Sequence, residues 1–176
     1  MGTGWAGDAW IVAATVLGPL AAVAATLWGQ ARLSARDRAR RAERVRVAVG
    51  YEVDANLRTA DAVRGEVGEA TRAAADRLRA ADRLARRGVP VWERDAYTSL
   101  LPELPEAIAT DEAMRDLAEH YARLREMDWC QRQLSEPGLA AVGDDDRRLM
   151  LWERYAAARE RVGTIGNPLR AGRAAP

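Results

Sequence analysis

The chain has 176 residues, a formal net charge of +1 and charged residues at 30% of its positions. Arginine supplies all of the basic side-chain charge, and the sequence contains neither lysine nor phenylalanine. Cys130 is the only cysteine, which excludes an intramolecular disulfide and a thiolate metal cluster. The abundance of alanine and arginine is typical of a GC-rich bacterial genome, so clusters of these residues carry less information here than they would elsewhere.

The amino-terminal part contains twenty consecutive uncharged residues, 9–28. Twenty helical residues at about 1.5 Å each cross the roughly 30 Å hydrocarbon core of a bilayer. Trp5, Trp10 and Trp28 lie near the two ends of this stretch, where amphipathic rings favour the headgroup region. We therefore predict a single transmembrane helix over residues 9–28 after a short external amino terminus, residues 1–8.

A buried helix of a soluble protein and a cleaved signal peptide are the alternative interpretations. The cleaved peptide is suggested by Ala22-Val23-Ala24, which has the small-x-small form of a cleavage site. A signal peptide also needs a positively charged amino-terminal region. Residues 1–8 contain no basic residue and one acid, Asp8. This distribution favours an anchor over a cleaved peptide.

The basic charge follows the uncharged stretch. Residues 29–49 carry seven arginines and two acids, a net charge of +5, whereas residues 50–176 have a net charge of −3. The positive-inside rule then places residues 30–176 in the cytoplasm and the amino terminus outside the bacterial plasma (inner) membrane. The expected membrane flank consists of Arg32, Arg36, Arg38, Arg40, Arg41, Arg44 and Arg46.

Membrane lipid is the expected partner of this flank, since each arginine beside anionic lipid contributes about 1 kcal/mol. A nucleic-acid partner is not expected, because base-stacking aromatic residues are not interleaved with the arginines. Ala14, Gly18 and Ala22 repeat at four-residue intervals, a spacing that lets transmembrane helices approach closely. Homo-oligomerisation through these residues is therefore a possibility that the sequence leaves open.

Helical periodicity dominates the rest of the chain, and we predict an all-α fold. A basic juxtamembrane and rod helix is expected over residues 29–64, with a buried stripe at Val49, Val53, Leu57, Ala60 and Val63. Whether this helix is straight or bent near residues 65–68 is left open. Residues 65–163 are predicted to form a bundle that packs on residues 45–64, and residues 164–176 a flexible tail.

Four further helices are expected in chain order, at about residues 67–87, 91–101, 111–135 and 145–163. Gly88 is predicted to end the 67–87 helix. Thr110 is predicted to cap the amino-terminal end of the 111–135 helix, and Asp144 that of the 145–163 helix. Short connections favour an antiparallel arrangement of about four cytoplasmic helices.

The sequence offers no catalytic constellation, so we expect a protein that is not an enzyme and that uses no cofactor and no metal. His120 lies one position from the stripe of its helix and is predicted to be a surface or boundary histidine. Cys130 is predicted to fill the core. The run Asp144-Asp145-Asp146 is explained by the unpaired N–H groups of a helix start.

Three polar residues are expected at the helix seam, Glu52, Asn56 and Asp128, where paired polar groups fix the register of packed helices. A hydrogen bond between the rod helix and the 111–135 helix is the favoured role, and a ligand pocket is the other. The aromatic-rich region around Trp92 and Tyr97 is the candidate interaction surface.

These observations lead to an expected function without a named process or partner. The chain is predicted to be a membrane-anchored helical protein that contacts another protein at the cytoplasmic face of the membrane. The alternative is an oligomerising effector that perturbs the bilayer when the bundle senses a signal.

Overall fold

The structure is a computed structural model that describes the backbone of residues 5–64, 73–141 and 143–171. Side chains are described for residues 20–64, 73–139 and 143–169. The chain divides into two compact units, Met1–Arg41 and Ala42–Pro176. The expected bend near residues 65–68 lies outside the described residues.

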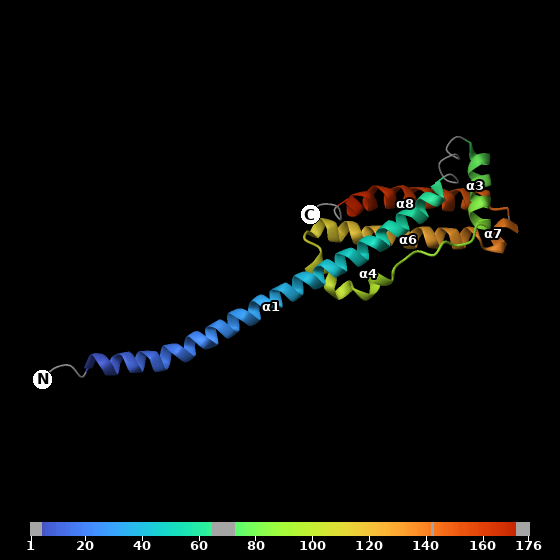
Figure 1. Cartoon of the computed structure of the whole chain (residues 1–176). Coiled ribbons are helices and arrows are strands. Elements are labelled where there is room, and N and C mark those ends of the chain that lie inside the picture. The colour runs from blue at the N-terminus through green and yellow to red at the C-terminus, as the bar shows by residue number, and fades with distance from the viewer. Residues whose placement is uncertain (1–4, 65–72, 142, 172–176) are drawn as a thin grey trace. The chain divides into compact units, whose positions relative to one another are not determined.

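Helices make up most of the described part of the chain (Figure 1), and this part contains no strand. The all-α prediction is therefore confirmed. The elements are α1 (Trp5–Ala62), α3 (Ala74–Arg86), α4 (Asp95–Ser99), the 3-10 helix η1 (Leu101–Glu103), α5 (Leu104–Ala107), α6 (Asp111–Leu134), α7 (Pro137–Ala141) and α8 (Asp145–Ala171).

The first unit contains the amino-terminal part of α1. Its described large apolar side chains are all exposed, namely Leu20, Val23, Leu27, Trp28 and Leu33. Over the residues that the structure describes, no helix combines the length and the apolar character needed to cross a membrane. The transmembrane helix predicted over residues 9–28 is thus unsupported by this finding, and the side chains of residues 9–19 are not among those described.

The second unit is organised around one buried stripe of α1. The five residues predicted for this stripe are buried, and the stripe extends back to Val45 and Ala42. Because the buried positions are three or four residues apart, they occupy one side of the helix. The stripe consists of Ala42, Val45, Val49, Val53, Leu57, Ala60 and Val63.

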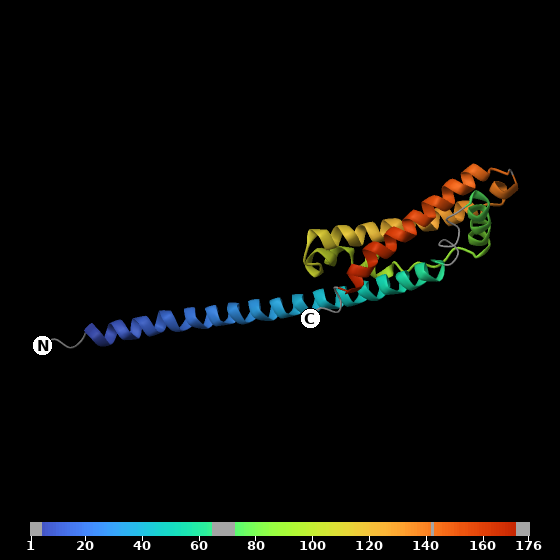
Figure 2. The same cartoon turned by 90° about the horizontal axis from the view of Figure 1, so that it is seen from above.

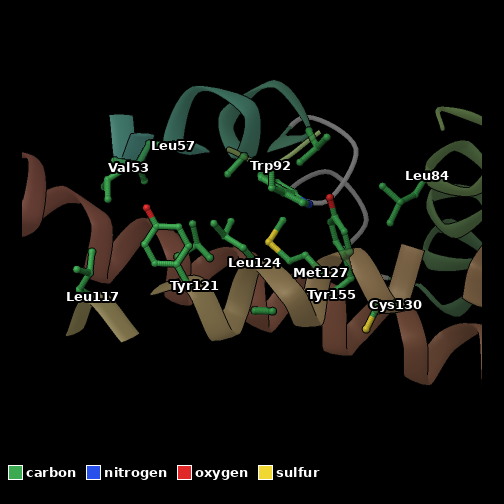
Figure 3. Close-up of a cluster of buried hydrophobic side chains, with 14 of the residues drawn as sticks. Val53, Leu57, Leu84, Trp92, Leu117, Tyr121, Leu124, Met127, Cys130 and Tyr155 are labelled. Carbon is green, nitrogen blue, oxygen red and sulfur yellow. The ribbon is translucent and has the colours of Figure 1, made fainter. Parts of the chain in front are cut away.

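α6 and α8 pack against each other (Figures 1 and 2) and supply much of the core that covers this stripe. Figure 3 shows the side chains of Leu117, Tyr121, Leu124 and Met127 of α6 gathered with those of Val53 and Leu57 of α1. These residues recur at three- or four-residue spacing along α6, as predicted. Burial of their apolar surface contributes roughly 25 cal/mol per Å² to folding.

α8 runs past the glycines at which it was expected to end, and this corrects the predicted end at residue 163. At Gly166 an added Cβ would lie 2.7 Å from Cδ2 of Leu57. The missing side chain therefore lets α8 approach α1 closely. Contact with the core outweighs the cost of about 1 kcal/mol that glycine imposes on a helix.

Three predicted helix-end signals are present. Thr110 caps α6 by accepting a hydrogen bond from the N–H of Ala113 at 3.1 Å, and Asp144 caps α8 by accepting one from Arg147 at 3.0 Å. Gly88 follows the end of α3 with φ of +80°, a left-handed conformation that glycine adopts at low cost.

Two other helices differ from their predicted bounds. The helix expected over 91–101 is replaced by the short α4 and η1, because Pro90 and Pro102 restrict the backbone on both sides. The helix expected over 67–87 is described from Ala74 onward, and residues 67–72 lie outside the described part.

Candidate functional site

Glu52 and Asn56 of α1 are buried polar residues that bind a residue just before α4 and the first turn of α4. The Nδ2 of Asn56 donates to the carbonyl oxygen of Glu93, and the N–H of Glu93 donates to Oδ1 of Asn56, both at 2.8 Å. Glu52 accepts hydrogen bonds from the N–H groups of Ala96 at 2.7 Å and Tyr97 at 3.2 Å. Both side chains therefore hold the backbone of residues 93–97 against α1.

Tyr121 connects this cluster to α6. Its hydroxyl donates to Oε1 of Glu52, which is the kind of hydrogen bond that was predicted between the rod helix and the 111–135 helix. Burial and the neighbouring Glu52 carboxylate raise the pKa of Tyr121, so the hydroxyl stays protonated and remains a donor.

Asp128, the third residue predicted for the seam, does not join Glu52 and Asn56. It forms salt bridges with Arg132 at 3.1 Å and with Arg94 at 3.6 Å. Arg94 belongs to the segment that Asn56 and Glu52 bind. Asp128 therefore attaches this segment to α6 as well as to α1. The polar residues predicted for the seam thus fix a loop in addition to a pair of helices.

Trp92 and Tyr97, predicted as the candidate interaction surface, lie inside the bundle. Trp92 is 7% exposed, and Figure 3 shows its ring turned toward the core. The Tyr97 ring is half-buried and stacks on Tyr121 with 3.9 Å between ring centroids. The rings of Trp92 and Tyr97 therefore pack within the bundle. Val91, at 83% exposure, is the exposed apolar residue of this region.

His120 is fully buried, and the prediction of a surface or boundary histidine is wrong. Its ring packs edge-on against Tyr121, with 5.4 Å between the centroids. Burial lowers the pKa of His120 to about 4, although the backbone of Val162 opposes part of this shift. The imidazole is therefore neutral at pH 7.

Cys130 is buried, as predicted, and burial raises the pKa of its thiol to about 11. A thiol with this pKa is a poor nucleophile at neutral pH. Within the described residues, no group of three or more His, Cys, Asp or Glu side chains is arranged to hold a metal ion.

Comparison with protein-family models, curated proteins and solved structures gave no match to this chain.

The predicted membrane flank separates into two parts. The side chains of Arg36, Arg40 and Arg41 are exposed, and the Arg32 guanidinium lies 5.2 Å from the centre of the Trp28 ring. Arg46 instead belongs to the second unit, where its Nε donates to the carbonyl oxygen of Ala107 at 2.7 Å. The Arg46 guanidinium thus binds the end of α5 and is part of the bundle, which the sequence did not indicate.

The transmembrane packing residues remain a prediction. The side chains of Ala14 and Gly18 are outside those described, and Ala22 is exposed.

The second unit contains an apolar groove of about 670 Å³ that the sequence did not reveal. The groove is lined by Val45, Val49 and Val53 of α1, by residues at the turn from α5 into α6, and by Leu169 near the end of α8. Charged residues line it as well, namely Glu43, Arg46, Glu112 and Asp116. Its size is within the range of ligand-binding sites in proteins. Three segments far apart in the sequence, within residues 43–53, 104–117 and 168–169, form it, which is why no local pattern could have predicted it.

Proposed function

We propose that this chain is a membrane-anchored α-helical protein that acts by protein–protein contact at the cytoplasmic face of the bacterial plasma membrane. The observation that carries the proposal is the exposure of Leu20, Val23, Leu27 and Trp28 in the first unit. Isolated apolar residues on a surface are ordinary, but a continuous apolar patch marks an interaction with a membrane or another molecule. Residues 9–28 contain no charged side chain that would oppose insertion in a bilayer.

The exposed arginines that follow support both the proposed membrane anchor and its proposed orientation. A helix from which Arg32, Arg36 and Arg40 project can bind anionic headgroups immediately after the apolar stretch. The ring of Trp28 beside Arg32 combines an amphipathic aromatic with a cation, a pairing suited to the headgroup region. Residues 30–176 would then be cytoplasmic.

The second unit supplies the contact with a partner. Tethering it to a membrane raises its effective concentration toward other proteins held there. It presents an apolar groove, which is the kind of surface through which proteins recognise helical segments.

Single-cysteine labelling tests the anchor and its orientation. In a Cys130→Ser background, Thr3→Cys should react with a membrane-impermeant maleimide in intact cells. Glu136→Cys, which replaces an exposed residue of the second unit, should react only after permeabilisation. The protein should also resist extraction by alkaline carbonate and dissolve in detergent. Recovery in the soluble fraction, or the opposite labelling pattern, would refute the proposal.

A further inference from the structure

We infer that the apolar groove of the second unit binds a segment of a partner protein that combines apolar side chains with arginine or lysine. This inference rests on the proposed function, because it names the chemistry of the partner that the bundle contacts. It follows from the apolar walls of the groove and from the excess of negative charge around it.

The walls indicate an apolar occupant. Val45, Val49 and Leu117 line the groove and are buried, so part of its wall belongs to the hydrophobic core. Ala113 and Ile108 are only partly buried, and their apolar surface is available to an occupant. Removing this surface from water would favour binding.

The charges indicate a basic occupant. Glu112 and Asp116 are four residues apart on α6, so their carboxylates lie on the same side of the helix and repel each other. A cation placed beside both would relieve this repulsion. Glu43 of α1 is a third carboxylate of the lining, but Arg46 offsets its charge, so the excess negative charge comes from Glu112 and Asp116.

The nearby cations of the bundle are bound to other carboxylates, Glu43 and Glu119. Arg46 is the one basic residue among those that line the groove, and its Nη1 lies 2.7 Å from Glu43. Arg161 lies in the electrostatic range of Asp116, but it donates hydrogen bonds to both carboxylate oxygens of Glu119, at 2.8 and 3.0 Å. The carboxylates of Glu112 and Asp116 therefore favour a basic segment and disfavour anionic lipid.

The test is a selection of peptides on the full-length protein in nanodiscs, with a displayed library of random 16-residue peptides. Enriched peptides should carry a net positive charge and apolar residues at three- or four-residue spacing. One enriched peptide is then synthesised with a fluorophore, and its dissociation constant is measured by fluorescence anisotropy. The affinity should fall as the salt concentration rises.

Two variants block the groove in different ways. Ala113→Trp fills it, and the pair Glu112→Arg and Asp116→Arg reverses its charge. Each should weaken peptide binding at least tenfold. Ala122→Trp, on an exposed part of α6, and the pair Glu136→Arg and Glu160→Arg are matched controls, and each should change the dissociation constant less than twofold. Circular dichroism confirms that the variants are folded.

Failure to enrich any peptide, or enrichment of acidic or uncharged peptides, would overturn the inference. So would unchanged binding to both groove variants. If Ala113→Trp converted a dimer into a monomer, or released a bound lipid seen by native mass spectrometry, the occupant would be a second copy or a lipid, and the inference would again be wrong. Peptide binding is measured on purified protein, so its outcome is separate from the labelling experiment that tests the anchor.

Discussion

At the scale of single residues, buried polar side chains determine how the irregular part of the bundle is attached to its helices. Asn56 uses both its donor and its acceptor on the backbone of Glu93, and Glu52 satisfies two backbone N–H groups. A buried polar group that lacks a partner costs about 1–3 kcal/mol. The segment from Glu93 to Tyr97 is therefore strongly coupled to α1.

Replacement of Asn56 tests this coupling. Asn56→Ala removes a fully buried amide, leaves the part-buried carbonyl and N–H of Glu93 without their partner, and should lower the free energy of unfolding by about 1–2 kcal/mol. Denaturant unfolding followed by circular dichroism measures the change. Asn167→Ala, at an exposed position of α8, is the control and should change stability by less than about 0.5 kcal/mol. Equal values for the two variants would contradict the assigned role of Asn56.

His120 makes stability depend on pH. Its folded-state pKa of about 4 is below the ordinary value of 6.5, so between these values the unfolded chain binds a proton that the folded chain does not. The free energy of unfolding should therefore be fully maintained above pH 6.5 and fall by up to about 3 kcal/mol as the pH decreases toward 4.

The measurement is urea unfolding of the full-length protein in detergent at several pH values from 7.5 to 4.5. His120→Leu removes the titrating group and should flatten the curve, especially between pH 6.5 and 5, above the range in which most carboxylates titrate. A curve of the same slope for both proteins would show that His120 is not the cause.

At the scale of elements, the close approach of α8 to α1 makes two glycines of one helix behave differently. An alanine Cβ at position 166 would meet Leu57 at 2.7 Å, whereas at position 163 nothing lies within 4 Å. Gly163→Ala should stabilise the protein by up to about 1 kcal/mol through helix propensity. Gly166→Ala should lose that gain to overpacking, and the two variants should differ by about 1–2 kcal/mol.

Thermal or denaturant unfolding of the two glycine variants gives this difference directly. Combining Gly166→Ala with Leu57→Ala should cost less than the sum of the single changes, because the clash is removed with the leucine. Additive costs would mean that α8 and α1 do not meet at this point.

The predictable elements are those whose signals are local. The stripe of α1, the caps Thr110 and Asp144 and the stop at Gly88 each depend on a few neighbouring residues, and each is present in the structure. His120 was misplaced because the side of α6 that faces α8 is set by long-range packing.

The burial of Gln131 also depends on long-range packing and could not be predicted from the sequence of its helix. Gln131 is fully buried and donates to the carbonyl oxygens of Leu84, at 3.2 Å, and Gly88, at the end of α3. Nothing in its own helix indicates that its partner is a helix end more than forty residues away. The groove, Trp92 and Tyr97 depend on tertiary packing in the same way.

At the scale of the whole molecule, the asymmetry between a basic flank and an acidic remainder should control orientation. Reversing Arg36, Arg38, Arg40 and Arg41 to glutamate removes most of the positive-inside signal. Thr3→Cys should then lose most of its reactivity with an impermeant maleimide in intact cells. Reversal of four exposed arginines of the bundle, Arg83, Arg86, Arg115 and Arg125, changes the net charge equally and should leave labelling intact.

The attachment of residues 93–97 to α1 determines how far the amino-acid sequence of this segment can change. Glu52 and Asn56 bind its peptide groups, and a peptide group is the same for every residue except proline. The side chains of Glu93 and Ala96 can therefore change with the attachment preserved, whereas proline at either position would remove a donor. At these two positions the bundle can present new side chains on a fixed backbone. The surface of this segment can therefore diversify without loss of the fold.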